Sequence, residues 1–516
     1  MKLFQTIIIR AAVGVTAIFW GVEVSLAADR PNIVLLMADD LGYGDLAYTG
    51  NPTVQTPELD RMAREGMRLS RFYAGAPVCT PTRASVMTGR NAFRSGTYWA
   101  GRYPLPEAEI TIGEIAHEAG YRTGFFGKWH LGKLTRDGSE VFAGEKAAPK
   151  EFAPPWRQGF DVCFAAEYSV PTYNPAVWDF EWRSVPEGKD KKYVMDRPLA
   201  YGEGTLVGKP MVRWPATFWR EGEKPSGRVI AGDSSAMVAD EAVKFIDESA
   251  KSKQPFLAVI WFFTPHSPSA AGNEDRALYP SVSMREQHWF GAITALDRQV
   301  GRVRAELAQL GIADNTFVHF CSDNGPSWIH DLGSSGPYRG RKGELHEGGI
   351  HVPGIVEWPG HLQGGSVLGV PMSTDDLLPT IAALTGAEAP KDRPLDGQNV
   401  LPILEGQAKE RSKPLVFRSV LRQNPVGWEA GEAKQSAVID GPWKLVSMDN
   451  DKTFALYDLD KDPQERTDLA AKEGERVKKM KEVLAGRIAS FAASARGEDY
   501  HLDKEALPKI ISPQGD

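Results

Sequence analysis

The segment that decides the fold is NIVLLMADDLGYGDL, residues 32–46. Its first seven residues, 32–38, are almost entirely apolar, and they are followed by Asp39, Asp40 and two turn-forming glycines. A short continuous apolar run bounded by turn residues is typical of a strand that is buried on both faces of a parallel sheet. Such a strand needs helices on both sides, so the segment predicts an α/β fold.

Further apolar runs extend this pattern along the chain. Strands of the same sheet are predicted at residues 121–126, 255–263, 316–321 and 352–358. Apolar residues with helical spacing predict helices between them, at residues 57–65, 111–119, 236–248, 285–310 and 375–384. We therefore expect a large, mostly parallel mixed sheet flanked by helices.

A smaller unit is predicted near the C-terminus. After a polar stretch at 406–413, a hairpin with an Asp440-Gly441 turn is expected over 437–446, followed by a strand at 454–459 and an amphipathic helix at 473–491. This pattern favours a catalytic α/β domain over residues 29–410 and an α+β subdomain with an antiparallel sheet over residues 411–516.

Composition excludes several classes of protein. Of the 516 residues, 42% are hydrophobic and 25% are charged, which argues against a disordered, collagen-like or multi-span membrane protein. The formal net charge of -7 gives no global basic field, so we expect no nucleic-acid partner.

Residues 1–28 resemble a signal peptide. Lys2 and Arg10 precede an apolar run at 11–22 that is too short to span a bilayer, and the small residues Ser25 and Ala27 suit cleavage after residue 27 or 28. The mature protein is expected to be exported, either to a periplasm or to the medium, without a stable membrane span. An uncleaved anchor is the alternative.

The chain has three cysteines, so at least one stays unpaired in an exported protein. Cys163 and Cys321 could form a disulfide or remain free, and the sequence does not decide between these states. Cys79 is the candidate for a thiol with a separate purpose.

Polar side chains follow four of the predicted strands. In α/β sheets ligands bind beyond the carboxyl ends of the strands, so these residues are expected to meet at one edge. They are Asp39 and Asp40, Lys128 and His130, His266, and Asp323 and Asn324. The pairs Asp39-Asp40 and Asp323-Asn324 alone could simply form turns, and His130 or His266 alone could be structural. Four strands that deliver such groups to one edge favour a shared site.

Two kinds of ligand are indicated at this edge. Asp39, Asp40, Asp323 and Asn324 offer only oxygen ligands, which Ca²⁺ and Mg²⁺ prefer and Zn²⁺ does not. Positive charge from Lys128, His130, Arg83 and Lys342 would suit a compact tetrahedral anion. For each basic residue taken singly, a solvated surface position is the alternative.

The region 150–220 fits neither the helical nor the strand period. It is expected to be a long insertion that either lines a pocket suited to sugar rings or packs irregularly on the core. It contains five of the fourteen tryptophans, Trp156, Trp178, Trp182, Trp214 and Trp219.

Residues 78–90, VCTPTRASVMTGR, carry the most specific motif. Cys79-Thr80-Pro81-Thr82-Arg83 has the Cys-x-Pro-x-Arg core of the sulfatase maturation signal, and Thr88-Gly89-Arg90 matches its second half. The family's order is also matched by residues 32–46 and by GKWHLG at 127–132, CSDNG at 321–325, KGELHEGG at 342–349 and LYDLDKDPQERTDLA at 456–470. The chain thus resembles a type I, formylglycine-dependent sulfatase of the alkaline phosphatase superfamily, closest to the arylsulfatase A and N-acetylgalactosamine-6-sulfatase group.

The resemblance implies a modified nucleophile. Cys79 would be oxidised by a formylglycine-generating enzyme to Cα-formylglycine, whose hydrated aldehyde attacks sulfur and gives a covalent sulfated intermediate. The second hydroxyl of the hydrate then allows sulfate to be expelled. The helix that follows is expected to begin near Pro81 or Thr82, which places residue 79 close to its positive end.

The resemblance also assigns roles to the other residues. A divalent cation, Ca²⁺ with Mg²⁺ as the alternative, would be held by residue 79 and the four oxygen donors Asp39, Asp40, Asp323 and Asn324. Arg83 would lie beside the nucleophile, Lys128, Lys342 and Ser169 would contact sulfate, His130 would act as the base, and His266 would protonate the leaving oxygen. The implied substrate is a sulfated sugar or polysaccharide, with aryl sulfates as surrogates.

Two alternative functions remain open from sequence. One is a phosphodiester or phosphonate ester hydrolase of the same superfamily. The chain lacks the histidine-rich set of a two-zinc phosphatase, which argues against that enzyme but not against this alternative. The other is an inactive relative that binds sulfated glycans. The resemblance leaves open the oligomeric state, the sugar, and whether His346, in the variable stretch 344–346, faces the site.

Overall fold

The computed structural model describes residues 30–101, 104–136, 151–174, 182–187, 190–195, 217–228, 230–327, 332–420 and 434–500. The expected signal peptide and its cleavage site lie outside these ranges. Within them, no helix combines the length and the apolar character that a membrane crossing requires.

A ten-stranded mixed sheet forms the centre of the molecule. From one edge to the other its strands are β10 (Lys224–Pro225), β9 (Trp219–Arg220), β5 (Val162–Ala166), β4 (Arg122–Lys128), β12 (Phe256–Pro265), β1 (Asn32–Asp39), β13 (Thr316–Ser322), β14 (Gly354–Glu357), β2 (Met67–Leu69) and β15 (Ser366–Leu368). The central run from β5 to β13 is parallel throughout. The predicted sheet and its five strands are confirmed.

The strand predicted at 352–358 differs in one respect. β14 is shorter than expected and pairs with β13 in the antiparallel direction. Apolar patterning shows that a strand is buried but carries no information on its direction. An antiparallel neighbour needs no crossover helix, and the 31 residues between β13 and β14 are used for loops and the short helix α8 (Glu347–Ile350).

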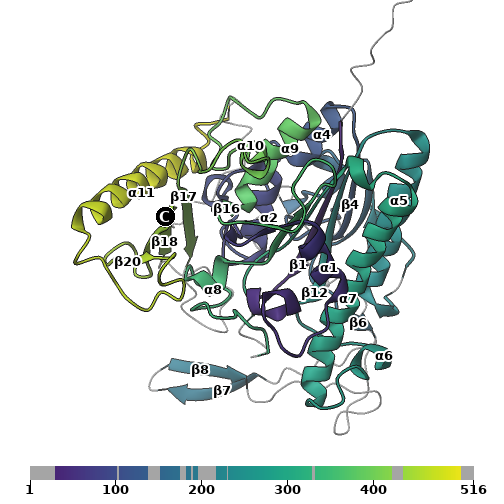
Figure 1. The fold of residues 1–516 in the computed structure, drawn as a ribbon, viewed down its shortest axis with the longest axis horizontal. Helices are drawn as coiled ribbons and strands as arrows, with labels where there is room; N and C mark the ends of the chain where they lie inside the picture. Colours follow the sequence, from purple (N-terminus) through teal and green to yellow (C-terminus); the bar gives the residue numbers. More distant parts are fainter. Residues whose placement is uncertain are drawn as a thin grey trace, which may run out of the picture.

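Helices cover both faces of the sheet because successive side chains of β1 point to opposite sides. Val34 and Leu36 enter a core with α1 (Pro57–Glu65), α5 (Ser234–Ser252) and α7 (Met284–Gln309), of which α5 and α7 lie side by side in Figure 1. Ile33 and Leu35 face a core with α2 (Cys79–Thr88), α4 (Ile112–Glu118) and α9 (Leu377–Thr385). The five predicted helices are confirmed, with ends that shift by up to four residues.

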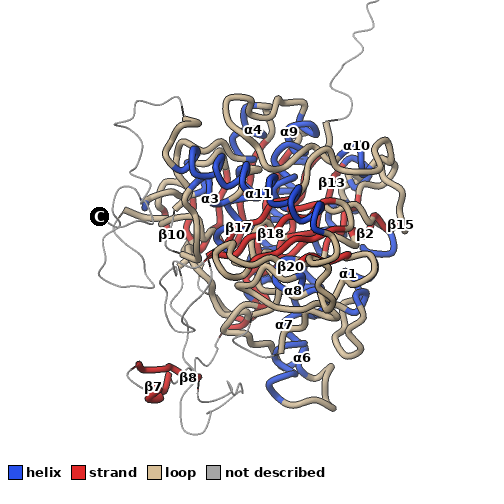
Figure 2. The backbone as a smooth tube through the Cα atoms, turned by 90° about the vertical axis from the view of Figure 1, so that its left-hand side faces the viewer, coloured by secondary structure: helices blue, strands red, loops and turns tan. Residues whose placement is uncertain are grey.

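The C-terminal part is a four-stranded antiparallel sheet with one long helix. It consists of β17 (Leu415–Val420), β18 (Lys434–Asp440), β19 (Trp443–Ser447), β20 (Ala455–Asp458) and α11 (Gly474–Ala495). The predicted hairpin, last strand and helix are confirmed, whereas β17 was not predicted. α11 packs across one face of this sheet (Figure 2), and Tyr73, Leu345 and Ile350 of the N-terminal part pack on the other.

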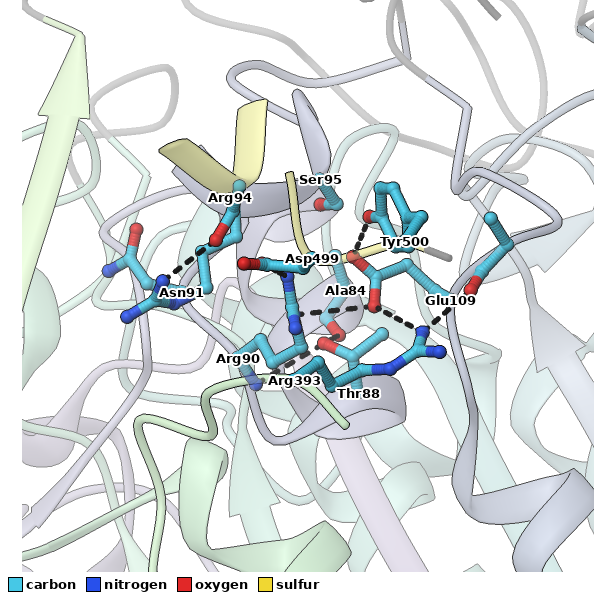
Figure 3. A network of polar contacts seen from close by, with 12 residues as sticks. Ala84, Thr88, Arg90, Asn91, Arg94, Ser95, Glu109, Arg393, Asp499 and Tyr500 are labelled. Carbon is cyan, nitrogen blue, oxygen red and sulfur yellow. Dashed lines mark hydrogen bonds and ion pairs between the residues drawn. The ribbon is translucent and has the colours of Figure 1, made fainter. Parts of the chain in front are cut away.

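The C-terminal end of α2 is tied to the end of the described chain (Figure 3). Arg90 donates to Asp499 Oδ2 at 2.7 Å, and its Nε lies 3.3 Å from Glu109 Oε2. The Tyr500 hydroxyl donates to Glu109 Oε1 at 2.5 Å, and Arg393 lies 3.8 Å from the same carboxylate. These contacts join the residues that follow α2 to the last described residues of the chain. All ten residues of α2 are buried.

The predicted insertion is more regular than expected, because β5 and β9 of the main sheet lie within it, and it also contributes strands to two short strand pairs. They are β6 (Tyr173–Asn174) with β11 (Gly232–Asp233) and β7 (Trp182–Glu187) with β8 (Asp190–Met195). Trp156 and Trp219 pack against the main core, as the packing alternative requires. Trp178 and Trp214 lie outside the described residues, and the side chain of Trp182 is not described.

The remaining short elements connect the larger ones. They are β3 (Phe72–Tyr73) paired with β16 (Met372–Ser373), and the helices α3 (Ala92–Ser95), α6 (Asn273–Arg276) and α10 (Leu401–Leu404). All three cysteines are free and buried. Cys163 on β5 and Cys321 on β13 are four strand spacings apart, about 19 Å, which is too far for a disulfide.

Candidate active site

The carboxyl ends of four adjacent strands meet, as expected, at one edge of the main sheet. β1 ends at Asp39 and β4 at Lys128, while His266 follows β12 and Asp323 follows β13. The four strands are neighbours in the order β4-β12-β1-β13. Parallel pairing therefore brings together side chains that are up to 284 positions apart in the sequence.

The acidic residues of this edge lie at the centre of a buried polar cluster. Asp39, Asp40 and Asp323 are at most 1% exposed. The backbone N–H of Asp40 donates to Asp323 Oδ1 at 3.0 Å, and the Asn324 side-chain amide donates to Asp40 Oδ1 at 2.8 Å. Asp40 has φ of 65°, a left-handed conformation that a non-glycine residue adopts at a cost and that is common at functional sites.

Each carboxylate has a cationic neighbour. Lys128 Nζ lies 2.7 Å from Asp39 Oδ2, and Lys342 Nζ lies 2.5 Å from Asp40 Oδ1. Although burial alone would raise the pKa of Asp39, the Lys128 ammonium holds it well below its usual range. Lys342 likewise lowers the pKa of Asp40 against the effect of burial. Both residues therefore carry a negative charge at neutral pH.

Arg83 completes the charge arrangement. Its Nη2 donates to Asp323 Oδ2 at 2.7 Å and lies 3.6 Å from Asp39 Oδ1, while Nη1 donates to the Lys128 carbonyl at 3.0 Å. The guanidinium also lies 5.0 Å from the ring centre of Trp261 on β12. Burial, reinforced by the charge of Asp39, raises the pKa of Asp323 to about 7 despite Arg83.

Three oxygens of this cluster accept no hydrogen bond from the described residues. They are Asp39 Oδ1, Asp40 Oδ2 and Asn324 Oδ1. A buried oxygen without a partner is costly and calls for a ligand. Oxygen donors of this kind fit a hard divalent cation, and one oxygen each from Asp39 and Asp40 lies within 4.8 Å of a His266 nitrogen in a group able to hold a metal ion. The residues present therefore fit a divalent cation.

Cys79 is the first residue of α2 and is 1% exposed. The helix begins two residues before the predicted start, because Thr80, Pro81 and Thr82 are already helical. Proline is tolerated in a first turn, where its missing N–H would have no intrahelical partner. Burial raises the pKa of the Cys79 thiol even though Lys128 and Lys342 oppose it, so the unmodified side chain is a protonated thiol at neutral pH.

Comparison with known proteins decides the family. A family model described as Sulfatase matches residues 31–387, and a second, described as N-sulphoglucosamine sulphohydrolase, C-terminal, matches residues 340–492. The chain belongs to the sulfatase family. Its membership makes it an enzyme of the sulfatase class and supports hydrolysis of a sulfate ester.

Individual relatives agree with this assignment. The sulfatase is 31% identical to mouse steryl-sulfatase, over 90% of this chain and 82% of the mouse protein, and 31% identical to mouse N-acetylgalactosamine-6-sulfatase, over 76% and 69%. The crystal structure of Ps i-CgsB in complex with k-i-k-neocarrahexaose superimposes with a TM-score of 0.70 at 25% identity, covering 87% of this chain and 91% of that chain.

The two histidines named from the sequence both line the sulfatase site. His130 is 8% exposed, has φ of 59°, and its Nδ1 has no partner among the described residues. Burial and the charges of Lys128 and Arg83 hold the pKa of His130 well below its usual value, so its imidazole is neutral and can accept a proton.

His266 is arranged differently. Its Nδ1 lies 2.8 Å from the Ser267 carbonyl and must donate to it, which leaves Nε2 facing the site, 3.7 Å from Asp40 Oδ2. Burial lowers the pKa of His266, although Asp39 and Asp40 counteract this effect. A protonated His266 therefore becomes more abundant as the pH falls.

Ser169 also lies at the site, with its hydroxyl 3.5 Å from Asp39 Oδ2. A small hollow next to His130 is lined by Gly101, Pro104, His130, Gly132, Lys133, Glu151, Glu167 and Tyr168. Tyr168 packs edge-on against the His130 ring, with 5.6 Å between ring centres.

Sequence reasoning missed a residue that holds His130 in place. The Thr80 hydroxyl donates to the His130 carbonyl at 3.0 Å and accepts from the Gly101 N–H at 3.0 Å. Its place inside the Cys-x-Pro-x-Arg motif was the available signal. His346, whose orientation was open, turns away from the site, with Nδ1 3.4 Å from Glu465 Oε2.

Proposed function

We propose that this sulfatase cleaves sulfate monoesters of sugars or polysaccharides, with residue 79 acting as formylglycine beside one Ca²⁺ ion. The observation that carries the proposal is the placement of Cys79 at the start of α2, in a buried site where three oxygens accept no hydrogen bond from the described residues. A protonated thiol is a weak nucleophile, which favours conversion of Cys79 over direct use of its sulfur. Formylglycine supplies, once hydrated, an oxygen nucleophile and a route for its own regeneration.

The cation would be held by Asp39, Asp40, Asp323 and Asn324 together with residue 79. A divalent ion of this kind supplies charge that stabilises the oxygens of the reacting ester. Mg²⁺ is the alternative ion, since both prefer oxygen donors.

The chain's own residues would perform the binding and proton transfers. Lys128 and Lys342 are the ammonium groups available to sulfate oxygens, with Ser169 as a further donor. Arg83 keeps Asp323 and Asp39 in place next to residue 79. His130, held neutral, would accept a proton at residue 79, and His266 in its protonated form would donate one from Nε2 to the leaving oxygen.

The decisive experiment combines mass spectrometry with kinetics. The protein is produced with a formylglycine-generating enzyme, and the peptide containing residue 79 is examined for conversion of thiol to aldehyde or hydrate. We expect conversion, with Cys79→Ala as the inactive control. If Cys79 stays a thiol while a control sulfatase is converted alongside, the proposal fails.

A panel of esters tests which substrate the sulfatase prefers. Since one structural neighbour was solved with a neocarrahexaose and two relatives are named for a steryl sulfate and an N-acetylgalactosamine 6-sulfate, the panel contains sulfated oligosaccharides, a steryl sulfate and an aryl sulfate. Matched phosphate and phosphonate esters test the alternative activity. We expect the highest kcat/KM on a sulfated saccharide, and faster phosphate or phosphonate cleavage would overturn this.

We also propose that the protein is exported from the cytoplasm. The signal-like segment 1–28 predicts a mature chain that starts at residue 28 or 29, outside the cytoplasm. N-terminal sequencing of protein recovered from the periplasm and from the medium distinguishes cleavage from an uncleaved anchor.

A further inference from the structure

Lys342 reaches the active site from a loop between β13 and β14, whereas Lys128 ends a central strand. Its Nζ lies 2.5 Å from Asp40 Oδ1, and its side chain is 13% exposed. A lysine side chain is long and flexible, so the position of its ammonium depends on how firmly the backbone is held. What fixes the loop therefore decides where this charge lies.

Gln435, on β18 of the C-terminal sheet, holds that loop directly. Its side chain is fully buried, and its Nε2 donates to the Gly343 carbonyl at 2.5 Å while its Oε1 accepts from the Leu345 N–H at 2.8 Å. A single primary amide thus satisfies one acceptor and one donor on either side of residue 344. The bond to Leu345 is buried and the bond to Gly343 is part-buried, and loss of a partner in such surroundings is costly.

The same loop is tied to the rest of the site. The Gly343 N–H donates to the carbonyl of Pro77, two residues before Cys79, at 2.8 Å. The Lys342 N–H donates to the Pro326 carbonyl, two residues after Asn324, at 3.1 Å. Gly343 has φ of 93°, a conformation that disfavours other residues, so the backbone shape here is specific.

Apolar packing adds to these bonds. Leu345 is fully buried in the cluster formed by Phe417, Ile439 and other residues on one face of the C-terminal sheet. The second family model, residues 340–492, begins just before Lys342 and contains both the loop and this sheet. The loop that carries Lys342 therefore packs against the C-terminal sheet.

We propose that Gln435 is a positioning residue for Lys342: by fixing the backbone at Gly343 and Leu345, it places the Lys342 ammonium where it holds the sulfate group. The inference rests on the proposed role of Lys342 in sulfate binding. It gives the C-terminal sheet a part in catalysis although Gln435 itself does not contact the reacting atoms.

A double-mutant cycle tests the inference. kcat and KM for a sulfate ester are measured for Gln435→Ala, Lys342→Ala and the double variant, each with its formylglycine content at residue 79 determined. We expect Gln435→Ala to lower kcat/KM by roughly 10- to 100-fold, the scale of a misplaced catalytic group. In the Lys342→Ala background the further loss should shrink to less than about twofold, because coupled residues are not additive.

The outcomes separate the inference from the proposed function. Equal losses in both backgrounds would show that Gln435 acts independently of Lys342, and the inference would be overturned. If Lys342→Ala leaves kcat/KM unchanged, the sulfate-binding role of Lys342 fails instead.

Two further variants guard against a general effect on the sheet. Ser436→Ala changes the next residue on β18, which is also buried but accepts from Arg418 and not from the loop, so kcat/KM should not change. Gln435→Met keeps the approximate volume of the side chain and removes its hydrogen bonds to Gly343 and Leu345, so we expect a loss of kcat/KM similar to that of Gln435→Ala. If Gln435→Ala does not fold, Gln435→Met replaces it in the cycle, and full activity in that variant would overturn the inference.

Discussion

Two of the buried clusters of charged side chains in the described part of this sulfatase differ in how completely their oxygens accept hydrogen bonds. The site cluster lies at the edge of the main sheet and contains Asp39, Asp40, Asp323, Asn324, Arg83, Lys128 and Lys342. The support cluster lies between the main fold and the C-terminal sheet and contains Tyr73, Glu347, His351, Lys444 and Glu465.

The carboxylates of the support cluster are closely paired. Lys444 Nζ lies 2.8 Å from Glu347 Oε1 and 2.9 Å from Glu465 Oε1. The second Glu347 oxygen accepts from the Tyr73 hydroxyl at 3.0 Å and lies 3.0 Å from His351 Nδ1, and the second Glu465 oxygen accepts from the Glu347 N–H at 2.7 Å. Every carboxylate oxygen here lies within 3.0 Å of a nitrogen or hydroxyl group, and Glu465 Oε1 alone is held by an ion pair and not by a hydrogen bond from the described residues.

The site cluster instead leaves three oxygens without a hydrogen bond from the described residues. A saturated network rigidifies a fold, whereas an unsaturated one has binding capacity left for a ligand. The comparison therefore predicts that changes in the site cluster affect activity more than stability, and that changes in the support cluster do the reverse.

The largest effect on activity is expected for Asp40→Asn. Removing this charge while keeping the shape should lower kcat/KM by at least about 10³-fold, because an electrostatic contribution to the transition state is lost. The melting temperature should change little, since Lys342 is partly exposed and can turn to water. Steady-state kinetics and calorimetry on the same sample check this, and a large loss of stability with retained activity would contradict it.

Lys444→Met should give the largest loss of stability. It leaves Glu347 and Glu465 buried without their shared counter-charge, which costs about 3–5 kcal/mol. Urea unfolding measures the loss. Lys391→Met is the control, because Lys391 forms an exposed pair with Glu388 whose removal should have no measurable effect. Equal stabilities of the two variants would refute the distinction between the clusters.

The pH dependence of the unfolding free energy should reveal the contribution of the Glu347 charge. Burial acts to raise the pKa of Glu347, but Lys444 and His351 lower it from 4.5 to about 2. The stabilisation, about 3 kcal/mol, is therefore fully present above pH 4.5 and is lost as the pH falls towards 2. The difference in unfolding free energy between wild type and Glu347→Gln should narrow in steps from pH 6 to pH 3. A constant difference would show that the charge does not contribute.

Cation binding should have the smallest effect on stability. Protein treated with a chelator and then given Ca²⁺ at 100 times its Kd should gain about 2.7 kcal/mol of unfolding free energy. Mg²⁺ is compared at the same concentrations to rank the two ions. Asp40→Asn is the matched variant and should lose most of this gain, and an equal gain in both proteins would place the ion elsewhere.

Sequence predicted the parts of this molecule that depend on local pattern. Apolar runs gave the central strands, and the residue types after them gave the edge at which Asp39, Lys128, His266 and Asp323 meet. Apolar patterning could not give the direction of β14, and the start of α2 depended on how Pro81 was accommodated. Distant pairings were also hidden: Lys444 and Glu347 are 97 positions apart, and nothing local marks Gln435 as a contact of Gly343.

The network at the far end of α2 has a consequence for the order of events during synthesis. Arg90 and its partner Asp499 are 409 positions apart, so the contacts in Figure 3 cannot form until nearly the whole chain has been made. At about 5–20 residues per second this takes roughly 20 to 80 seconds. Afterwards Cys79 is 1% exposed and out of reach of another protein. The proposed conversion of Cys79 by another enzyme would therefore have to take place on the growing or newly released chain, before its last residues dock.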